Sequence, residues 1–329
     1  MGNVRRAYVY LVSIISLQSV AWAVISLLRD LLVPGRSSSV GSTAWQIALI
    51  VVGLPVYLVH WLWAQRLAAK DPEERESVLR RLYLYAAMGV AVATLIANAF
   101  DLLDTLMRLV LGSFTGYRSL SPTDLIIHHL VAMAVMALIW FYHRRVLAGD
   151  TRAEPETRGG ATVRRLYLYG FSAAGLTMTS LAVIALLGWL MAQFGGSGIT
   201  DSHAGTTREV ARLVVGVPLW LIFWTRAQRL FAGPNEEERA SVVRKLYLYL
   251  AVFIAVLAVV TATTFVLAGG MRRLLGISSP GGDGDIREAL AIIIPMALVW
   301  AYHTYVLRHD AERADEQAGE AWVRQLYYY

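Results

Sequence analysis

Several stretches of this chain are apolar over roughly the 20 residues that a helix needs to cross the hydrocarbon core of a membrane. Eight such runs begin near Ala7, Trp45, Leu82, Leu125, Leu166, Glu209, Leu246 and Ala289. The run Leu246–Met271 contains no charged residue, whereas the sixth run is the weakest because Arg212 and Arg226 flank a short uncharged centre. The runs are continuous rather than alternating, which favours helices over a membrane barrel. The sequence predicts an all-α integral membrane bundle with eight transmembrane helices.

The composition agrees with this prediction. The chain has 329 residues, of which 57% are hydrophobic and only 16% charged, against about a quarter charged in soluble domains. The apolar run that follows Arg6 is too long for the core of a signal peptide, so we expect a retained first helix. Cysteine is absent, which excludes disulfides, thiolate nucleophiles and cysteine-ligated metals.

Internal repetition is the second strong signal. The first, third, fifth and seventh runs each open with a basic pair and two tyrosines. The copies are Arg5–Tyr10, Arg80–Tyr85, Arg164–Tyr169 and Arg244–Tyr249, with a partial fifth copy at Arg324–Tyr329. Their starting points lie 75 to 84 residues apart. A fixed period of this kind indicates a repeated supersecondary unit, and here we predict a two-helix hairpin that occurs four times.

The other four runs repeat in two forms, which defines a larger unit. The second and sixth runs share a pattern that begins at Pro55 and Pro218, and the fourth and eighth share one that ends at His143 and His303. We therefore predict two parallel four-helix units, at residues 1–150 and 151–323. Residues 324–329 would start a possible further repeat.

The basic residues predict the orientation. Nine of the 30 Lys and Arg residues fall on one side of the predicted spans and the other 21 on the side of the N-terminus. The positive-inside rule places that side, with both termini, in the cytoplasm of a bacterial inner membrane. The net charge of +6 is explained by this asymmetry, so we expect lipid rather than nucleic acid as the partner. The linkers at 70–76 and 234–239 are expected to form short solvated helices, because Pro followed by acids is typical of a helix start.

The motifs resemble a known family. A basic pair with Leu-Tyr-Leu-Tyr, followed by a Pro-x-x-Leu-x-x-Trp helix that ends in Ala-Gln-Arg-Leu, is similar to a bacterial membrane-domain family known only as a domain of unknown function. The resemblance implies two tandem copies over nearly the whole chain. It brings no activity and no site residues.

The repeated motif is the first candidate site, either as a strip that binds lipid head groups or a partner, or as a topology anchor. Basic residues hold the inner face, and tyrosines commonly sit at the membrane interface. We favour the anchor interpretation, because residues i and i+2 point to different faces of a helix. The predicted anchors are Arg80, Arg81, Tyr83, Tyr85, Arg164, Arg165, Tyr167, Tyr169, Arg244, Lys245, Tyr247 and Tyr249.

A second candidate is a possible metal or proton-relay site in the second hairpin. Asp101 and Asp104 share a helix face, and His128 and His129 lie at the start of the next helix. Carboxylates and imidazoles together can bind a divalent metal. The equivalent positions of the second unit hold Phe265 and Ala268, so the cluster is not part of the repeat.

The third candidates are His60, His143 and His303, near the inner ends of the second, fourth and eighth helices. Histidines on facing helices can serve as axial haem ligands. Because His143 and His303 sit beside Trp and Tyr, an interfacial aromatic belt also explains them. We expect no cofactor.

The sequence favours a non-enzymatic scaffold or interaction protein, which would bind other membrane proteins or form a homo-oligomer. No phosphate loop, zinc-binding helix or nucleophile elbow occurs, although this leaves the question of an enzyme open. A transporter is the alternative, because Pro55, Pro218 and Pro295 fall inside spans, where proline can break a helix at a transport site or form a purely structural kink. A haem- or metal-binding redox protein is the weaker alternative.

Overall fold

The structure is a computed structural model of the chain. It describes residues 2–33, 39–112, 121–154, 156–193, 203–233, 236–239, 241–277 and 284–327. Side chains are not described for residues 203–204, 236, 284–285 and 313–327. The connections between the first and second and between the seventh and eighth predicted spans lie outside the described residues at positions 34–38 and 278–283. The same holds for the side chains of the partial fifth motif.

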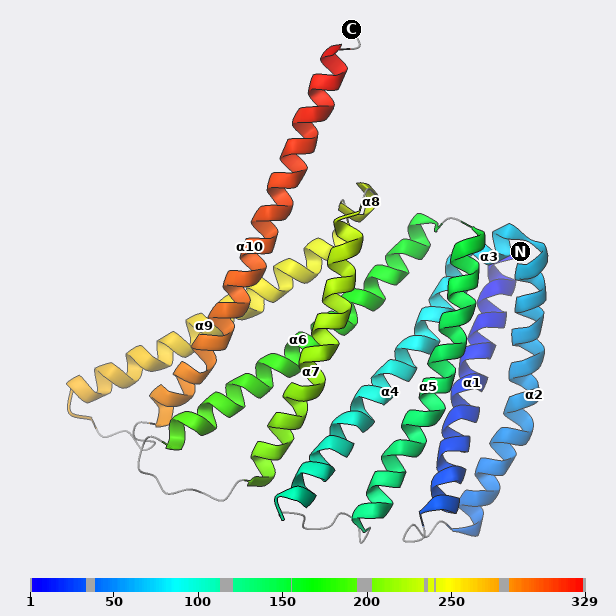
Figure 1. Ribbon diagram of the computed structural model, residues 1–329, viewed down its shortest axis with the longest axis horizontal. Coiled ribbons are helices and arrows are strands. Elements are labelled where there is room, and N and C mark those ends of the chain that lie inside the picture. Colours follow the sequence, from blue (N-terminus) through cyan, green and yellow to red (C-terminus); the bar gives the residue numbers. More distant parts are fainter. Residues whose placement is uncertain are drawn as a thin grey trace. The chain divides into compact units, whose positions relative to one another are not determined.

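In the part of the chain that the structure describes, eight helices are long and apolar enough to cross a membrane, which confirms the eight predicted runs. The described residues contain helices and no strands. The long helices are α1 (Gly2–Leu32), α2 (Val40–Lys70), α4 (Val78–Val110), α5 (Pro122–Ala153), α6 (Arg158–Gln193), α7 (His203–Phe231), α9 (Val242–Leu274) and α10 (Gly284–Tyr327) (Figure 1).

Two short helices stand before α4 and α9, where the sequence predicted them. They are α3 (Pro72–Glu76) and α8 (Glu236–Arg239). In α3, the Asp71 side chain accepts from the backbone N–H of Glu73 and Pro72 occupies the first turn, as the sequence pattern requires. The two helices are not fully solvated as predicted, because Glu74 is only 3% exposed and Glu238 is also buried.

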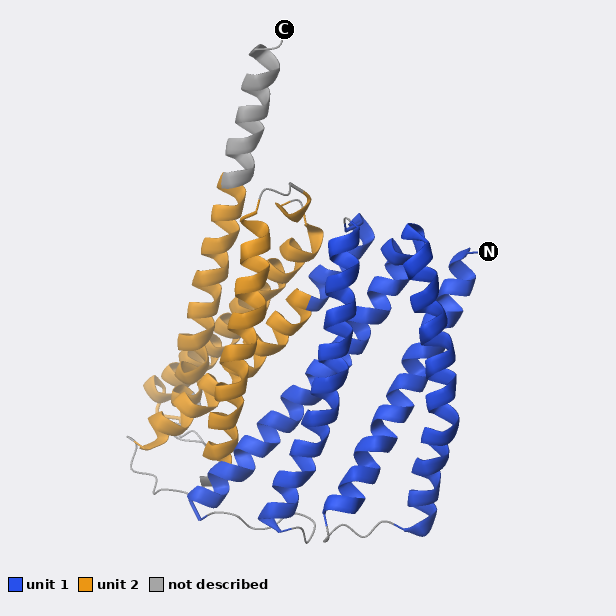
Figure 2. Cartoon of the chain, turned by 45° about the vertical axis from the view of Figure 1, so that its right-hand side comes forward, with its two compact units in different colours: residues 1–167 blue, residues 168–329 orange. Residues whose placement is uncertain are grey.

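The chain forms two compact units, residues 1–167 and residues 168–329 (Figure 2). The sequence placed the seam at 150. Unit 1 extends to residue 167 because the first turns of α6 pack against α4. The packing is close, since a Cβ added to Gly159 would lie 2.4 Å from Cγ2 of Val78. Within unit 1, α1 packs against α2, α4 packs against α5, and α1 also contacts α4 and α5. Within unit 2, α9 packs against α10.

Each unit has an aromatic core at the end where its basic–tyrosine motifs lie. In unit 1, Tyr10, Trp61 and Tyr83 belong to one buried cluster. In unit 2, the corresponding cluster contains Tyr169, Trp224 and Tyr247. These two clusters surround the polar groups that form the candidate site.

Candidate functional site: a buried polar cluster in each unit

A buried ion pair anchors the cluster of each unit. In unit 1, Nε of Arg80 on α4 donates to Asp150 on α5 at 2.7 Å, and the Arg80 side chain is 1% exposed. In unit 2, Nε of Arg244 on α9 donates to Asp310 on α10 at the same distance. A second guanidinium nitrogen reaches the same carboxylate in both units, at 3.2 and 3.0 Å. Such two-point pairs fix the orientation of the guanidinium as well as its position.

A tyrosine–histidine contact lies one helical turn further into each unit. Nδ1 of His143 lies 2.7 Å from the carbonyl oxygen of Ile139, which can only accept, so this nitrogen carries the proton in the neutral ring. Nε2 then accepts from the Tyr83 hydroxyl at 3.1 Å. His303 repeats the arrangement. Its Nδ1 lies 2.8 Å from the carbonyl oxygen of Val299, and its Nε2 lies 3.4 Å from the Tyr247 hydroxyl.

In each cluster a tryptophan from a third helix packs against the other members and donates a hydrogen bond to a tyrosine hydroxyl. The Trp61 indole N–H on α2 donates to the Tyr142 hydroxyl at 2.6 Å, and Trp224 on α7 donates to Tyr302 at 2.6 Å. The Trp61 ring also packs against Tyr83, with centroids 4.9 Å apart. The guanidinium of Arg80 lies 5.6 Å from the Trp61 ring, and the equivalent distance in unit 2 is also 5.6 Å. These contacts add cation–π attraction to the ion pair.

The spacing along the helices explains why these side chains meet. Arg80 and Tyr83 are three residues apart on α4, so they lie on one face. His143 and Asp150 are seven residues apart on α5, two helical turns, and share a face as well. The same spacings recur in α9 and α10. Two facing stripes of this kind bring the arginine to the carboxylate and the tyrosine to the imidazole.

The two clusters differ in how the central tyrosine hydroxyl is satisfied. In unit 2, the Ser172 hydroxyl donates to Tyr247 at 3.2 Å. Ser13 is the equivalent of Ser172 in unit 1. It is fully buried, and its hydroxyl has no hydrogen-bond partner among the described residues. In unit 1 the Tyr83 hydroxyl is hydrogen-bonded to Tyr57 instead of to a serine.

The contacts of these groups hold helices together within each unit. In unit 1 the cluster joins α2, α4 and α5, and the Tyr10 hydroxyl of α1 also reaches Arg80. A charged or polar group inside an apolar bundle is costly unless it is paired. Because each member has its partner on another helix, separating the helices would leave these groups unpaired.

The haem candidates make contacts with other residues. His143 and His303 occupy equivalent places in different units, and both nitrogens of each ring already have partners. His60 lies against Tyr8 instead, with ring centroids 5.6 Å apart, and its Nδ1 faces the Val56 carbonyl. An axial haem ligand needs a ring nitrogen available to the iron, and in His143 and His303 both nitrogens make hydrogen-bond contacts.

The acidic and histidine candidates of the second hairpin are partly brought together, because the His128 and His129 rings lie 5.3 Å apart and the Asp101 charge acts on His129. Their other contacts are to residues outside the cluster. Arg108 pairs with Asp104 at 2.9 Å, and Nδ1 of His129 lies 3.1 Å from the Asn98 amide oxygen. Arg29 of α1 reaches the backbone carbonyl of His128 at 2.9 Å. Asp101 contributes its carbonyl oxygen to a helix hydrogen bond. Within the described ranges, no group of three or more His, Asp and Glu side chains is placed to hold a metal ion.

The predicted anchors fall into three groups by burial. Most of them are buried, namely Arg80, Arg81, Tyr83, Tyr85, Arg165, Tyr169, Arg244 and Tyr247. Lys245 and Tyr249 are exposed, whereas Arg164 and Tyr167 are half-buried. Tyr83 and Tyr85 point to different neighbours, as expected for positions i and i+2. The buried members therefore have packing roles inside the units, and their anchoring to a membrane surface stays a prediction.

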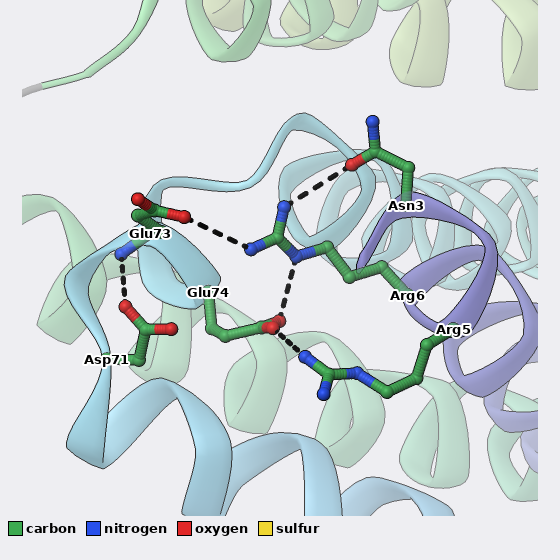
Figure 3. Close-up of polar contacts among 6 residues, drawn as sticks. All are labelled: Asn3, Arg5, Arg6, Asp71, Glu73 and Glu74. Carbon is green, nitrogen blue, oxygen red and sulfur yellow. Dashed lines mark hydrogen bonds and ion pairs between the residues drawn. The ribbon is translucent and has the colours of Figure 1, made fainter. Parts of the chain in front are cut away.

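A second ionic cluster ties the N-terminus of α1 to α3. Glu74 accepts from both Arg5 and Arg6, and Nε of Arg6 lies 3.0 Å from the Glu74 carboxylate (Figure 3). Arg6 also contacts Asn3 and, at 3.9 Å, Glu73. Glu74 is the buried member of this N-terminal clasp, the ionic cluster formed by Arg5, Arg6 and Glu74. The neighbouring Glu73 side chain is 87% exposed. The basic pair of the first motif therefore fixes the linker between the second and third long helices.

Sequence reasoning missed Asp150, Asp310 and Glu74 as site residues. The signal for the two aspartates is present, because each follows the repeated histidine by seven residues. Glu74 stands in a run of acids, and nothing in that run distinguishes the buried carboxylate from its exposed neighbours.

Comparison with known proteins places the chain in a family. The model of the family described as Domain of unknown function (DUF5671) matches residues 6–140 and again residues 165–298. The chain belongs to this family and contains two tandem copies of its domain, as the motifs indicated. Each matched range contains the arginine, the central tyrosine and the tryptophan of one cluster. The other members of the two clusters lie just beyond the matched ranges, namely Tyr142, His143, Asp150, Tyr302, His303 and Asp310. Neither the curated proteins nor the solved structures contain a match to the chain.

Proposed function

We propose that the chain is a multi-pass protein of the bacterial cytoplasmic membrane and acts as a non-enzymatic scaffold. Its four repeated two-helix hairpins would form two parallel four-helix units with both termini in the cytoplasm. The observation that carries the proposal is the duplicated buried cluster. In both units the arginine is paired with the carboxylate, and the histidine and the tryptophan are each hydrogen-bonded to a tyrosine hydroxyl. This mutual pairing favours a structural role over a catalytic one.

The outer surfaces agree with an interaction role. Long apolar stripes remain exposed on α1, α2 and α9, and in a bilayer such faces meet lipid or other membrane helices. A rigid unit with several apolar faces is suited to holding partners at fixed positions. The transporter alternative rests on the prolines inside α2, α7 and α10. The pocket of about 440 Å³ between α1 and α2 has an almost wholly apolar lining, which suits a hydrocarbon chain better than a polar solute.

Purified full-length protein tests the class of function. We expect a reduced-minus-oxidised visible spectrum without a haem band, no stoichiometric metal, and no protein-dependent flux of protons, sodium or chloride in proteoliposomes. Cross-linking in intact membranes should give discrete protein adducts from the exposed stripes. A haem band or bound metal would establish the redox alternative, and protein-dependent flux would establish the transporter.

The orientation can be tested separately, because the chain has no cysteine of its own. Single cysteines at Ser42 and Glu73 mark the two ends of α2 and its flanking helix. With a membrane-impermeant maleimide on spheroplasts, we expect Ser42→Cys to react at once and Glu73→Cys to react only after permeabilisation. The opposite pattern would invert the proposed topology.

A further inference from the structure

The start of α6 packs along the start of α4 inside unit 1. A Cβ on Gly159 would meet Val78, and a Cβ on Gly160 would lie 3.4 Å from Cγ of Arg81. Further along, the rings of Tyr85 and Tyr167 lie 5.2 Å apart. These contacts follow the same order on both helices, so the two helices run side by side in the same direction. The packing leaves Tyr85 only 8% exposed.

The equivalent face of unit 2 lies on α9 and is uncovered. Aligned on the basic–tyrosine motif, Val242 corresponds to Val78, Lys245 to Arg81 and Tyr249 to Tyr85. All three are exposed, and Tyr249 is 62% exposed, against 8% for Tyr85. The same helix face continues through Phe253. The surface that α6 covers in unit 1 is therefore open in unit 2, as far as the described residues show.

The helix that corresponds to α6 at the other end of the chain is α1. It carries the first copy of the motif, and its Tyr8 corresponds to Tyr167. Tyr8 contacts His60 with one edge of its ring and is still 57% exposed. Val4, Leu11 and Ile15 extend the exposed stripe along the helix, with the i, i+4, i+7 spacing of a packing face.

The two stripes match in register. On α1 the exposed positions 4, 8, 11 and 15 lie four, three and four residues apart, and on α9 positions 242, 246, 249 and 253 have the same spacing. Both helices begin with the motif, as α4 and α6 do. A parallel pairing of α1 with α9 would therefore use the same helix faces and the same order of contacts that unit 1 already shows between α4 and α6.

We infer that α1 of one copy docks along α9 of a second copy, with Tyr8 against Tyr249. This inference rests on the proposed scaffold function and names its partner as another molecule of the same chain. Different surfaces meet in such a contact, so it is a head-to-tail interface, which builds rings when the rotation closes and filaments when it does not. In a bilayer, close side-chain packing rather than the hydrophobic effect stabilises the contact, and the Tyr85–Tyr167 pair provides the pattern.

Cysteine cross-linking between two tagged copies tests the contact. One copy carries Tyr8→Cys and the other Tyr249→Cys, and both are co-expressed and treated in native membranes with a short bis-maleimide. We expect a dimer that carries both tags, and little product when either variant is expressed alone. Both positions are exposed, so the substitutions leave the cores intact. Tyr85→Cys with Tyr167→Cys in one chain is the positive control for reagent and reach.

The matched negative control replaces Tyr8→Cys by Val59→Cys on α2, a position with a similar exposed fraction of 65%. An equal yield with Val59→Cys would show random collision and overturn the inference. So would the absence of a dimer when the positive control reacts, or homodimers from a single variant. An adduct of Tyr249→Cys with a different protein would also overturn self-docking. An adduct with a different protein would leave the proposed scaffold function intact. A haem band, a bound metal or protein-dependent ion flux would contradict the scaffold function independently of the cross-linking result.

Discussion

The Tyr83 hydroxyl and Nε2 of His143 meet at 3.1 Å in the core of unit 1, although 60 positions separate them in the chain. Tyr247 and His303 make the same contact in unit 2, at 3.4 Å. The two units thus share one arrangement of tyrosine, histidine, tryptophan, arginine and aspartate. The repetition allows each prediction about one unit to be checked against its counterpart in the other.

Removing the carboxylate charge of the ion pair should destabilise unit 1. Asp150→Asn leaves the buried Arg80 guanidinium without a counter-charge, and breaking a buried pair in this way costs about 3–5 kcal/mol. Asp310→Asn should cost less, because the Asp310 side chain is 18% exposed. Thermal unfolding in mild detergent, followed by tryptophan fluorescence, measures both. The double variant Arg80→Met with Asp150→Leu should recover most of the loss, and equal losses in single and double variants would contradict the ion-pair argument.

The clasp at the N-terminus of α1 gives a matched pair of glutamates. Glu74→Gln removes the charge that both Arg5 and Arg6 contact, so we expect faster hydrogen exchange in the first turns of α1 and in α3. Glu73→Gln changes an exposed neighbour, and exposed ion pairs contribute only about 0–1 kcal/mol. Its exchange pattern should stay close to that of the unaltered chain. Identical patterns for the two variants would show that the buried carboxylate has no special role.

The fold was predictable from sequence to a greater extent than the site was. Apolar runs and a repeated motif are local signals, so the eight helices and the two domain copies could be found without tertiary information. Which face of a helix is buried depends on its neighbours. The motif tyrosines therefore suggested a membrane interface, whereas Tyr83 and Tyr247 pack inside. The partnership of Arg80 with Asp150 could not be read from one sequence, since it depends on how α4 and α5 align.

Glycine at the α6–α7 contact should be intolerant of substitution. A Cβ on Gly175 would lie 2.4 Å from the backbone nitrogen of Trp220, so Gly175→Ala must push the helices apart. Overpacking of this kind costs about 1–3 kcal/mol. In unit 1, Gly53→Ala would meet only the end of the Val20 side chain, at 2.9 Å, and should cost less. Gly170→Ala, with no atom within 4 Å of the added Cβ, is the control and should be neutral or stabilising. Melting temperatures ranked in any other order would contradict the close approach.

The two serines at the tyrosine hydroxyls should respond differently to the same change. Ser172→Ala removes a hydrogen bond to Tyr247, a loss of about 1 kcal/mol. Ser13→Ala removes a buried hydroxyl that has no partner among the described residues. Its loss should therefore be neutral or slightly stabilising, because a buried polar group without a hydrogen bond carries a desolvation cost. Paired thermal melts of the two variants give the sign of each effect. A clear destabilisation by Ser13→Ala would mean that its hydroxyl has a partner after all, and that Tyr83 does not depend on Tyr57 alone.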